Sequence, residues 1–192
     1  MPRPKAYDEE KVLDAAMLCF WHKGYCATSM KDLQGCTGLT AGSLYNSFGS
    51  KDSLFLQVLD HYIEKIVAGR VERFLSSGDA IDGIERYFYD SFQARVDKDC
   101  IGCLLVNTST ELGPHDEAVR AKLAVGSRVS AEGIKKALIR AQAAGQLPIN
   151  LDPKLQAAHL GFLMSGMLVT SKYTDSDRWM NTAMGVVRSL IH

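Results

Sequence analysis

Residues 28–51 read TSMKDLQGCTGLTAGSLYNSFGSK, and this stretch decides the fold. Thr28 or Ser29 can cap a first short helix, because a hydroxyl there can accept a hydrogen bond from an unpaired backbone N–H. Gly38 suits the left-handed turn that ends a helix, and Thr40 can cap a second short helix. Two short helices joined by a glycine turn predict a helix-turn-helix motif.

The predicted second helix carries small and polar side chains that suit contact with DNA. Small residues at its N-terminus let the backbone approach a duplex, and hydroxyl and amide groups can bind phosphate oxygens or base edges. Helical spacing alone leaves open an ordinary solvated helix in a domain that binds no DNA. The candidate DNA-binding residues are Thr28, Ser29, Thr40, Ala41, Gly42, Ser43, Tyr45, Asn46 and Lys51.

The overall charge gives no support to nucleic-acid binding. Twenty-two Lys and Arg residues balance 22 Asp and Glu residues, so any attraction to phosphates must come from local placement. No signal-peptide core is visible, and no apolar run approaches the ~18 residues that span a bilayer. Five cysteines, an odd number, fit free thiols in a reducing compartment. We expect a cytoplasmic protein with no membrane segment.

Helical periodicity continues through nearly the whole chain, and no sustained alternating strand pattern interrupts it. We predict an all-α fold of about nine helices. A helix-turn-helix head occupies residues 1–50, and a helical body occupies residues 51–192. After a first helix at about 8–22 and the two short helices, the predicted helices cover about 51–74, 80–96, 103–112, 116–144, 152–173 and 175–190.

The register of residues 8–60 resembles the tetracycline-repressor (TetR) family of bacterial transcription regulators. The matching segments are Gly24-Tyr25, residues 28–33, Gly38-Leu39-Thr40, residues 42–45, Phe48 and residues 50–54. Two departures concern the motif itself: residues 34–37 replace an alanine-rich helix end, so the first short helix is expected to fray early. Ala41 stands where many relatives carry lysine, arginine or proline.

The resemblance implies a homodimer whose two heads enter successive major grooves of double-stranded DNA. It assigns phosphate contacts to Tyr45 and Lys51, and further backbone contacts to Thr28 and Ser29. The residues nearest the bases would be Thr40, Ala41, Ser43 and Asn46. The implied function is a repressor that leaves a palindromic operator when it meets a small hydrophobic effector or when a thiol is modified.

In this family the body holds an effector pocket and the dimer surface. Aromatic, Met and polar residues at helical spacing give the candidate pocket residues, although such stripes are also typical of plain core. These are Tyr62, Tyr87, Phe88, Phe92, Leu105, Asn107, Thr108, Met164 and Met167. Small residues on apolar stripes near the C-terminus permit close helix packing, either within an ordinary core or, as the resemblance implies, at a dimer interface. That interface would contain Gly161, Ser165, Leu168, Met184 and Val187.

Cys100 and Cys103 form a single C-x-x-C pair. Without a second pair or suitably spaced histidines, this spacing is weak evidence for zinc, so we expect no metal or cofactor. Cys103 opens a predicted helix, where a thiol is more reactive, and its segment resembles one in TetR-type sensors of electrophiles or oxidants. Cys103 is therefore a candidate sensor or, alternatively, a packed apolar residue. No nucleophile elbow, phosphate loop or metal-spaced histidine cluster predicts an enzyme.

Overall fold

The computed structural model describes residues 7–93, 102–113, 116–174 and 177–191. These residues form helices and no strand, with α4, η1 and α5 joined into one continuous helix. The described chain thus has nine helices, which confirms the predicted all-α fold. The bounds are α1 (Glu9–Lys23), α2 (Met30–Thr37), α3 (Ala41–Phe48), α4 (Lys51–Tyr62), η1 (Ile63–Ala68), α5 (Gly69–Leu75), α6 (Ala80–Gln93), α7 (Leu104–Glu111), α8 (Glu117–Ala143), α9 (Pro153–Thr170) and α10 (Asp177–Ile191).

The head packs α1, α2 and α3 around one apolar core. Leu33 of α2 and Leu44 of α3 are fully buried, and Phe20 of α1 meets Phe55 of α4 edge to face at 4.8 Å. Residues of α4, including Val58, belong to the same core. The head therefore depends on α4 for its packing, and the division at residue 50 stays a prediction.

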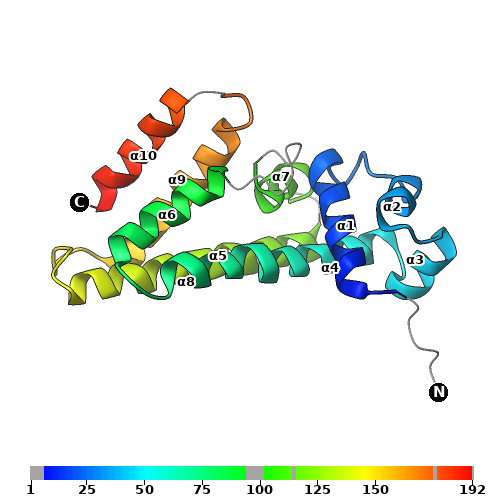
Figure 1. Cartoon of the computed structure of the whole chain (residues 1–192), viewed down its shortest axis with the longest axis horizontal. Coiled ribbons are helices and arrows are strands. Elements are labelled where there is room, and N and C mark those ends of the chain that lie inside the picture. The colour runs from blue at the N-terminus through cyan, green and yellow to red at the C-terminus, as the bar shows by residue number, and fades with distance from the viewer. Residues whose placement is uncertain (1–6, 94–101, 114–115, 175–176, 192) are drawn as a thin grey trace, which may run out of the picture.

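The long helix from Lys51 to Leu75 carries the head core into the body. It lies beside α8, as Figure 1 shows. A single helix was predicted here, but its middle, η1, is π-helical. A π-helical turn is wider than an α-helical turn, and such turns occur frequently at functional sites.

The body has a second apolar core between α5, α6, α8, α9 and α10. Ile84, Leu138, Leu160 and Val187 are fully buried in it. The Nη1 atom of Arg140 donates a hydrogen bond of 2.7 Å to the carbonyl oxygen of Leu75, which satisfies an acceptor at the end of the long helix. No helix among the described ranges is both long and apolar enough to cross a bilayer.

Candidate DNA-binding surface and effector cavity

Side-chain caps fix the two helices of the motif. At α2, Ser29 and Asp32 form a capping box, with 2.8 Å between Ser29 N and Asp32 Oδ2 and 3.2 Å between Asp32 N and Ser29 Oγ. Gly38 ends α2 at φ +71°, and the hydroxyl of Thr40 accepts a hydrogen bond of 3.2 Å from Ser43 N at the start of α3. The predicted caps are therefore present, and they set the turn between the helices.

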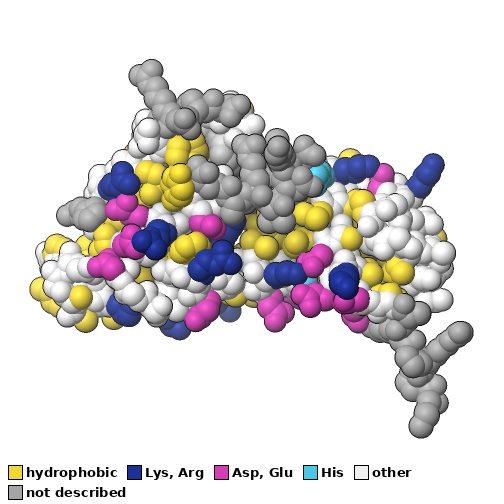
Figure 2. Space-filling model, viewed as in Figure 1, with side chains coloured by type: hydrophobic (Ala, Val, Ile, Leu, Met, Phe, Trp, Pro, Cys, Tyr) yellow, Lys and Arg dark blue, Asp and Glu magenta, His cyan; other side chains and the backbone are white. Residues whose placement is uncertain are grey.

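The second helix of the motif, α3, buries one face and presents the other. Leu44 and Phe48 are buried in the head. Tyr45 is 51% exposed, and Asn46 is exposed beside it. Among the remaining candidates, Ser29, Thr40 and Gly42 are exposed, and Ala41, Ser43 and Lys51 are half-buried. The end of the molecule that carries α2 and α3 shows few charged side chains in Figure 2.

Thr28 does not join this surface, and the structure corrects its predicted role. Its side chain is 1% exposed, and its hydroxyl donates a hydrogen bond of 2.6 Å to the carbonyl oxygen of Gly24. Thr28 therefore stabilises the turn between α1 and α2 from inside. A threonine beside a capping serine gives no local signal of which hydroxyl points outward.

Gln34 has a structural role that the sequence did not reveal. Its Oε1 atom accepts a hydrogen bond of 3.2 Å from Ala41 N, so a side chain of α2 caps the first N–H of α3. The expected early fraying of α2 is wrong, because the helix continues to Thr37, whose hydroxyl donates to Leu33 O at 2.6 Å. The Gln34 bond links α2 directly to the start of α3.

Lys51 lies at the N-terminus of α4 against an aromatic ring. Its Nζ atom is 4.2 Å from the ring centroid of Tyr25, a cation–π distance. The Tyr25 hydroxyl donates a hydrogen bond to the carboxylate of Asp52. The ammonium group is thus placed at a helix start, where the N–H groups also favour phosphate.

The body contains a cavity of about 470 Å³ between the long helix, α6, α7, α8 and α9. Four of the predicted pocket residues line it: Tyr62, Tyr87, Leu105 and Met164. The others do not: Phe88 and Met167 are buried in the body core, Phe92 packs edge to face on Trp179 at 5.6 Å, and Asn107 and Thr108 lie on α7 outside the lining.

Cys103 lines the cavity as the residue that precedes α7. Its Sγ atom accepts a hydrogen bond of 3.3 Å from the hydroxyl of Tyr62. Burial, together with the adjacent thiol of Cys103, raises the pKa of Tyr62 well above its usual value, so the phenol stays protonated as the donor. Trp21 of the head packs edge to face on Tyr62 at 5.1 Å. Cys100, the other predicted member of the pair, lies outside the described residues.

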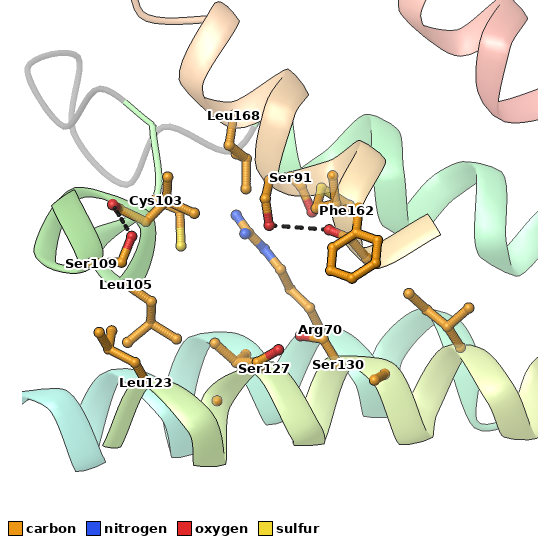
Figure 3. A pocket seen from close by; sticks show the side chains of 18 of the residues that line it. Arg70, Ser91, Cys103, Leu105, Ser109, Leu123, Ser127, Ser130, Phe162 and Leu168 are labelled. Atoms are coloured by element: carbon orange, nitrogen blue, oxygen red, sulfur yellow. Dashed lines mark hydrogen bonds between the residues drawn. The ribbon is translucent and has the colours of Figure 1, made fainter. Parts of the chain in front are cut away.

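Sequence reasoning missed the polar groups of the cavity. The guanidinium of Arg70 points into its centre (Figure 3), and the Nε atom is 2.9 Å from Asp90 Oδ2. Hydroxyl groups surround it, including Ser130, whose Oγ lies 3.0 Å from the hydroxyl of Tyr87. The remaining lining hydroxyls are those of Ser91, Ser109, Ser127 and Ser165. No cluster of three metal-binding side chains occurs in the part of the chain that the structure describes.

The π-helical turn explains why periodicity did not predict this lining. Tyr62, Val67 and Arg70 all face the cavity. In a regular α-helix, Tyr62 and Val67 would point about 140° apart. The wider turn at η1 brings both side chains to the same wall.

The predicted dimer residues line the cavity or are buried within the chain, and Leu168 does both. Gly161, Ser165 and Leu168 line the cavity, and Ser165 is exposed. Leu168, Met184 and Val187 are 6%, 4% and 0% exposed within the single chain, so they have almost no surface to offer a second copy. The exposed large apolar residues on α9, the segment after it and α10 are Leu155, Phe162, Val169, Tyr173 and Val186.

Two family models match separate parts of this chain. Residues 12–58 match bacterial regulatory proteins of the tetR family, and residues 83–187 match the tetracyclin repressor-like C-terminal domain. The HTH-type transcriptional repressor ComR of Escherichia coli (strain K12) is 31% identical over 172 residues, covering 88% of this chain and 82% of ComR. The repressor DhaR of Mycobacterium sp. (strain GP1) is 29% identical over 156 residues, covering 80% of this chain and 76% of DhaR.

Solved structures agree over nearly the full length. A cysteine mutant of the TetR family regulator CifR, in complex with a 26-base-pair double-stranded operator DNA, superposes with a TM-score of 0.81 at 26% identity and covers 98% of both chains. The reduced form of E. coli NemR superposes with a TM-score of 0.83 at 22% identity, covering 95% of this chain and 96% of NemR. This similarity shows that the two proteins share a fold. This chain belongs to the tetR family and is a DNA-binding transcriptional regulator, not an enzyme.

Proposed function

We propose that the protein is a cytoplasmic repressor that holds a palindromic operator as a homodimer and releases it in response to a small molecule or a thiol modification. The observation that carries this proposal is the continuous helix from Lys51 to Leu75. Its first residues complete the head, and Tyr62, Val67 and Arg70 further along line the cavity. One rigid element thus connects the DNA-facing surface to the cavity.

The exposed face of α3 is proposed to read the operator. Tyr45 and Lys51 would contact phosphates, and Ser29 would meet the DNA backbone at α2. The small Gly42 permits close approach to the duplex, and the residues nearest the bases would be Thr40, Ala41, Ser43 and Asn46. A two-fold dimer then requires half-site centres about 34–36 Å apart.

Binding to the DNA upstream of the protein's own coding sequence tests this assignment. Fluorescence anisotropy at a stated salt concentration should show tight binding that unrelated DNA does not compete away. Tyr45→Ala should weaken it at least tenfold. Tyr89→Ala is the matched control, because Tyr89 is a similarly exposed tyrosine (49%) on α6 of the body. Equal affinities for the two variants would refute the assignment to α3.

The second copy is proposed to pack on α9 and α10. Phe162 and Tyr173 are 77% and 76% exposed, which is unusual for large apolar side chains unless another surface covers them. Gly166 and Gly185 are also exposed on these helices and have nothing within 4 Å of an added Cβ, so a partner helix can approach there closely. The interface thus keeps the predicted helices but uses their outer residues.

The cavity is proposed to bind an apolar effector that carries hydrogen-bonding groups. Leu105, Ile134, Met164 and Leu168 supply apolar walls, while hydroxyl groups and the Arg70 guanidinium offer hydrogen bonds. Such a molecule releases DNA only if it binds the non-binding conformation more tightly. A few kcal/mol of preference is enough.

Cys103 offers a second route of control by soft electrophiles. Its thiol would add to an activated carbon–carbon double bond, with the sulfur forming the new bond and the thiol proton ending on the neighbouring carbon. The probe is N-ethylmaleimide, which should weaken operator binding by the unchanged protein. Cys103→Ser should abolish the effect, whereas Cys26→Ser, which removes an exposed thiol, should not. An effect that survives Cys103→Ser would exclude this role.

A further inference from the structure

Glu111 joins the body to the head by hydrogen bonds to the backbone of residues 25 and 26. It is the last residue of α7, and its carboxylate accepts two backbone hydrogen bonds from the segment between α1 and α2. The distances are 3.0 Å from Tyr25 N to Oε2 and 2.6 Å from Cys26 N to Oε1. We propose that Glu111 is a positioning residue for DNA binding that transmits the position of α7 to the head. This inference rests on the proposed effector control.

The segment that receives the carboxylate is shaped for it. Gly24 has φ +79° and ψ 165°, a backbone conformation that residues other than glycine rarely adopt. A Cβ atom at Gly24 would lie 3.0 Å from Glu111 Oε2, so the missing side chain makes room for the carboxylate. The same carboxylate raises the pKa of the Cys26 thiol, which lies beside it. Both features indicate a built contact.

From the backbone of Tyr25 the contact reaches the DNA-facing surface. The Tyr25 ring packs against Phe20 at 6.1 Å and Phe55 at 4.8 Å, and the Nζ atom of Lys51 lies 4.2 Å above it. Two charge-assisted hydrogen bonds that hold residues 25 and 26 therefore also hold the platform under Lys51. Lys51 is the cation proposed to contact phosphate.

At its other end, α7 forms one wall of the cavity. Cys103 immediately precedes the helix, and Leu105 and Ser109 on it also line the cavity (Figure 3). Because α7 is a single helix only about 12 Å long, a displacement of its cavity-lining residues would carry Glu111 with it. A molecule that displaces this wall therefore displaces Glu111 from residues 25 and 26. This route reaches the first turns of the long helix through α7 and residues 25 and 26, not along the helix itself.

The first test replaces the carboxylate in the full-length protein. Glu111→Ala should weaken operator affinity about tenfold, and amide hydrogen exchange at Tyr25 and Cys26 should speed up by at least tenfold. Glu111→Gln keeps one acceptor oxygen and should give an intermediate effect on both measurements. The control is Glu64→Gln, an exposed carboxylate on η1.

The salt dependence separates positioning from general destabilisation. If Lys51 loses its phosphate contact in both copies, the slope of log affinity against log salt should fall by about 1.8, or 0.9 for each contact. An unchanged slope with unchanged exchange at residues 25 and 26 would overturn the proposal. If the unchanged protein fails to bind the operator specifically, the proposed function itself fails, while the exchange measurement still tests the contact.

The second test asks whether the signal passes through Glu111. In a Cys26→Ser, Cys36→Ser, Cys100→Ser background, N-ethylmaleimide modifies Cys103. Alkylation should weaken operator binding and speed exchange at the amides of residues 25 and 26. With Glu111→Ala added, it should weaken binding much less. Equal weakening in both backgrounds would overturn transmission through Glu111, and no weakening in either would contradict the proposed thiol control alone.

Discussion

Gly24→Ala is expected to destabilise the protein by about 2–5 kcal/mol. The conformation of Gly24, φ +79° and ψ 165°, costs a residue with a side chain about 1–3 kcal/mol. The new Cβ would also lie 3.0 Å from Glu111 Oε2 and 3.2 Å from Oε1. Displacing this carboxylate weakens two hydrogen bonds to a charged acceptor. Because Cys26 is exposed and water replaces part of that loss, about 1–2 kcal/mol remains.

Gly145→Ala is the control that isolates the second contribution. Gly145 also has a positive φ, +72°, but a Cβ there meets nothing within 4 Å. The free energy of unfolding of this variant should therefore fall by only about 1–2 kcal/mol, the cost of placing an alanine at a positive φ. For a chain of this length, each kcal/mol lowers Tm by about 2–4 °C. Thermal unfolding followed by circular dichroism at one fixed protein concentration gives the comparison.

If the two conformational costs are equal, the variants should differ by the hydrogen-bond loss of about 1–2 kcal/mol, which is about 2–8 °C in Tm. The loss from Gly24→Ala should shrink by about 1–2 kcal/mol in a Glu111→Ala background, because the carboxylate that the new Cβ displaces is then absent. Equal losses for Gly24→Ala and Gly145→Ala in the unchanged background would refute the contact between Glu111 and the head.

Three further predictions concern the cavity, the head and the dimer face. Gly126→Ala would place a Cβ 2.4 Å from Leu105 Cδ1 and should cost about 1–3 kcal/mol in denaturant unfolding. A hydrogen bond from Lys23 lowers the pKa of Asp32. The ionised carboxylate therefore stabilises the folded protein above about pH 3.9, and this stabilisation is lost as the pH falls and the carboxylate is protonated. The Tm deficit of Asp32→Asn should therefore shrink from about pH 6 to about pH 3. Phe162→Asp should convert dimer to monomer in sedimentation velocity, and an unchanged dimer would move the interface elsewhere.

The fold and the motif could be predicted because their signals are local. Ser29, Gly38 and Thr40 act within a few residues of themselves, so spacing alone gives the start and the end of α2 and the start of α3. The burial of Thr28 could not be predicted from local sequence. Its hydroxyl belongs to the interior because of how the turn before α2 folds back toward Gly24.

The cavity could be predicted only in part because its lining depends on register and on distant contacts. The π-helical turn at η1 shifts the facing side chains after Tyr62, and nothing in the apolar pattern marks that shift. Arg70 looks like one more solvated charge in a long helix, yet it points into the cavity (Figure 3). Glu111 meets Tyr25 across 86 positions of sequence, which no spacing rule covers.

The balanced charge of the head makes geometry the main control over DNA binding. With zero net charge and an alanine at position 41, few strong contacts hold each head, so affinity depends on both heads fitting at once. The helix from Lys51 to Leu75 is roughly 35 Å long, and a tilt of about 5° moves its end by about 3 Å. Two such displacements in opposite directions shift the half-site spacing by about 6 Å, more than the ~3.4 Å between successive base pairs. Because Glu111 holds residues 25 and 26, which pack on the first turns of this helix, loss of Glu111 should lower operator affinity by itself and leave an effector less affinity to remove.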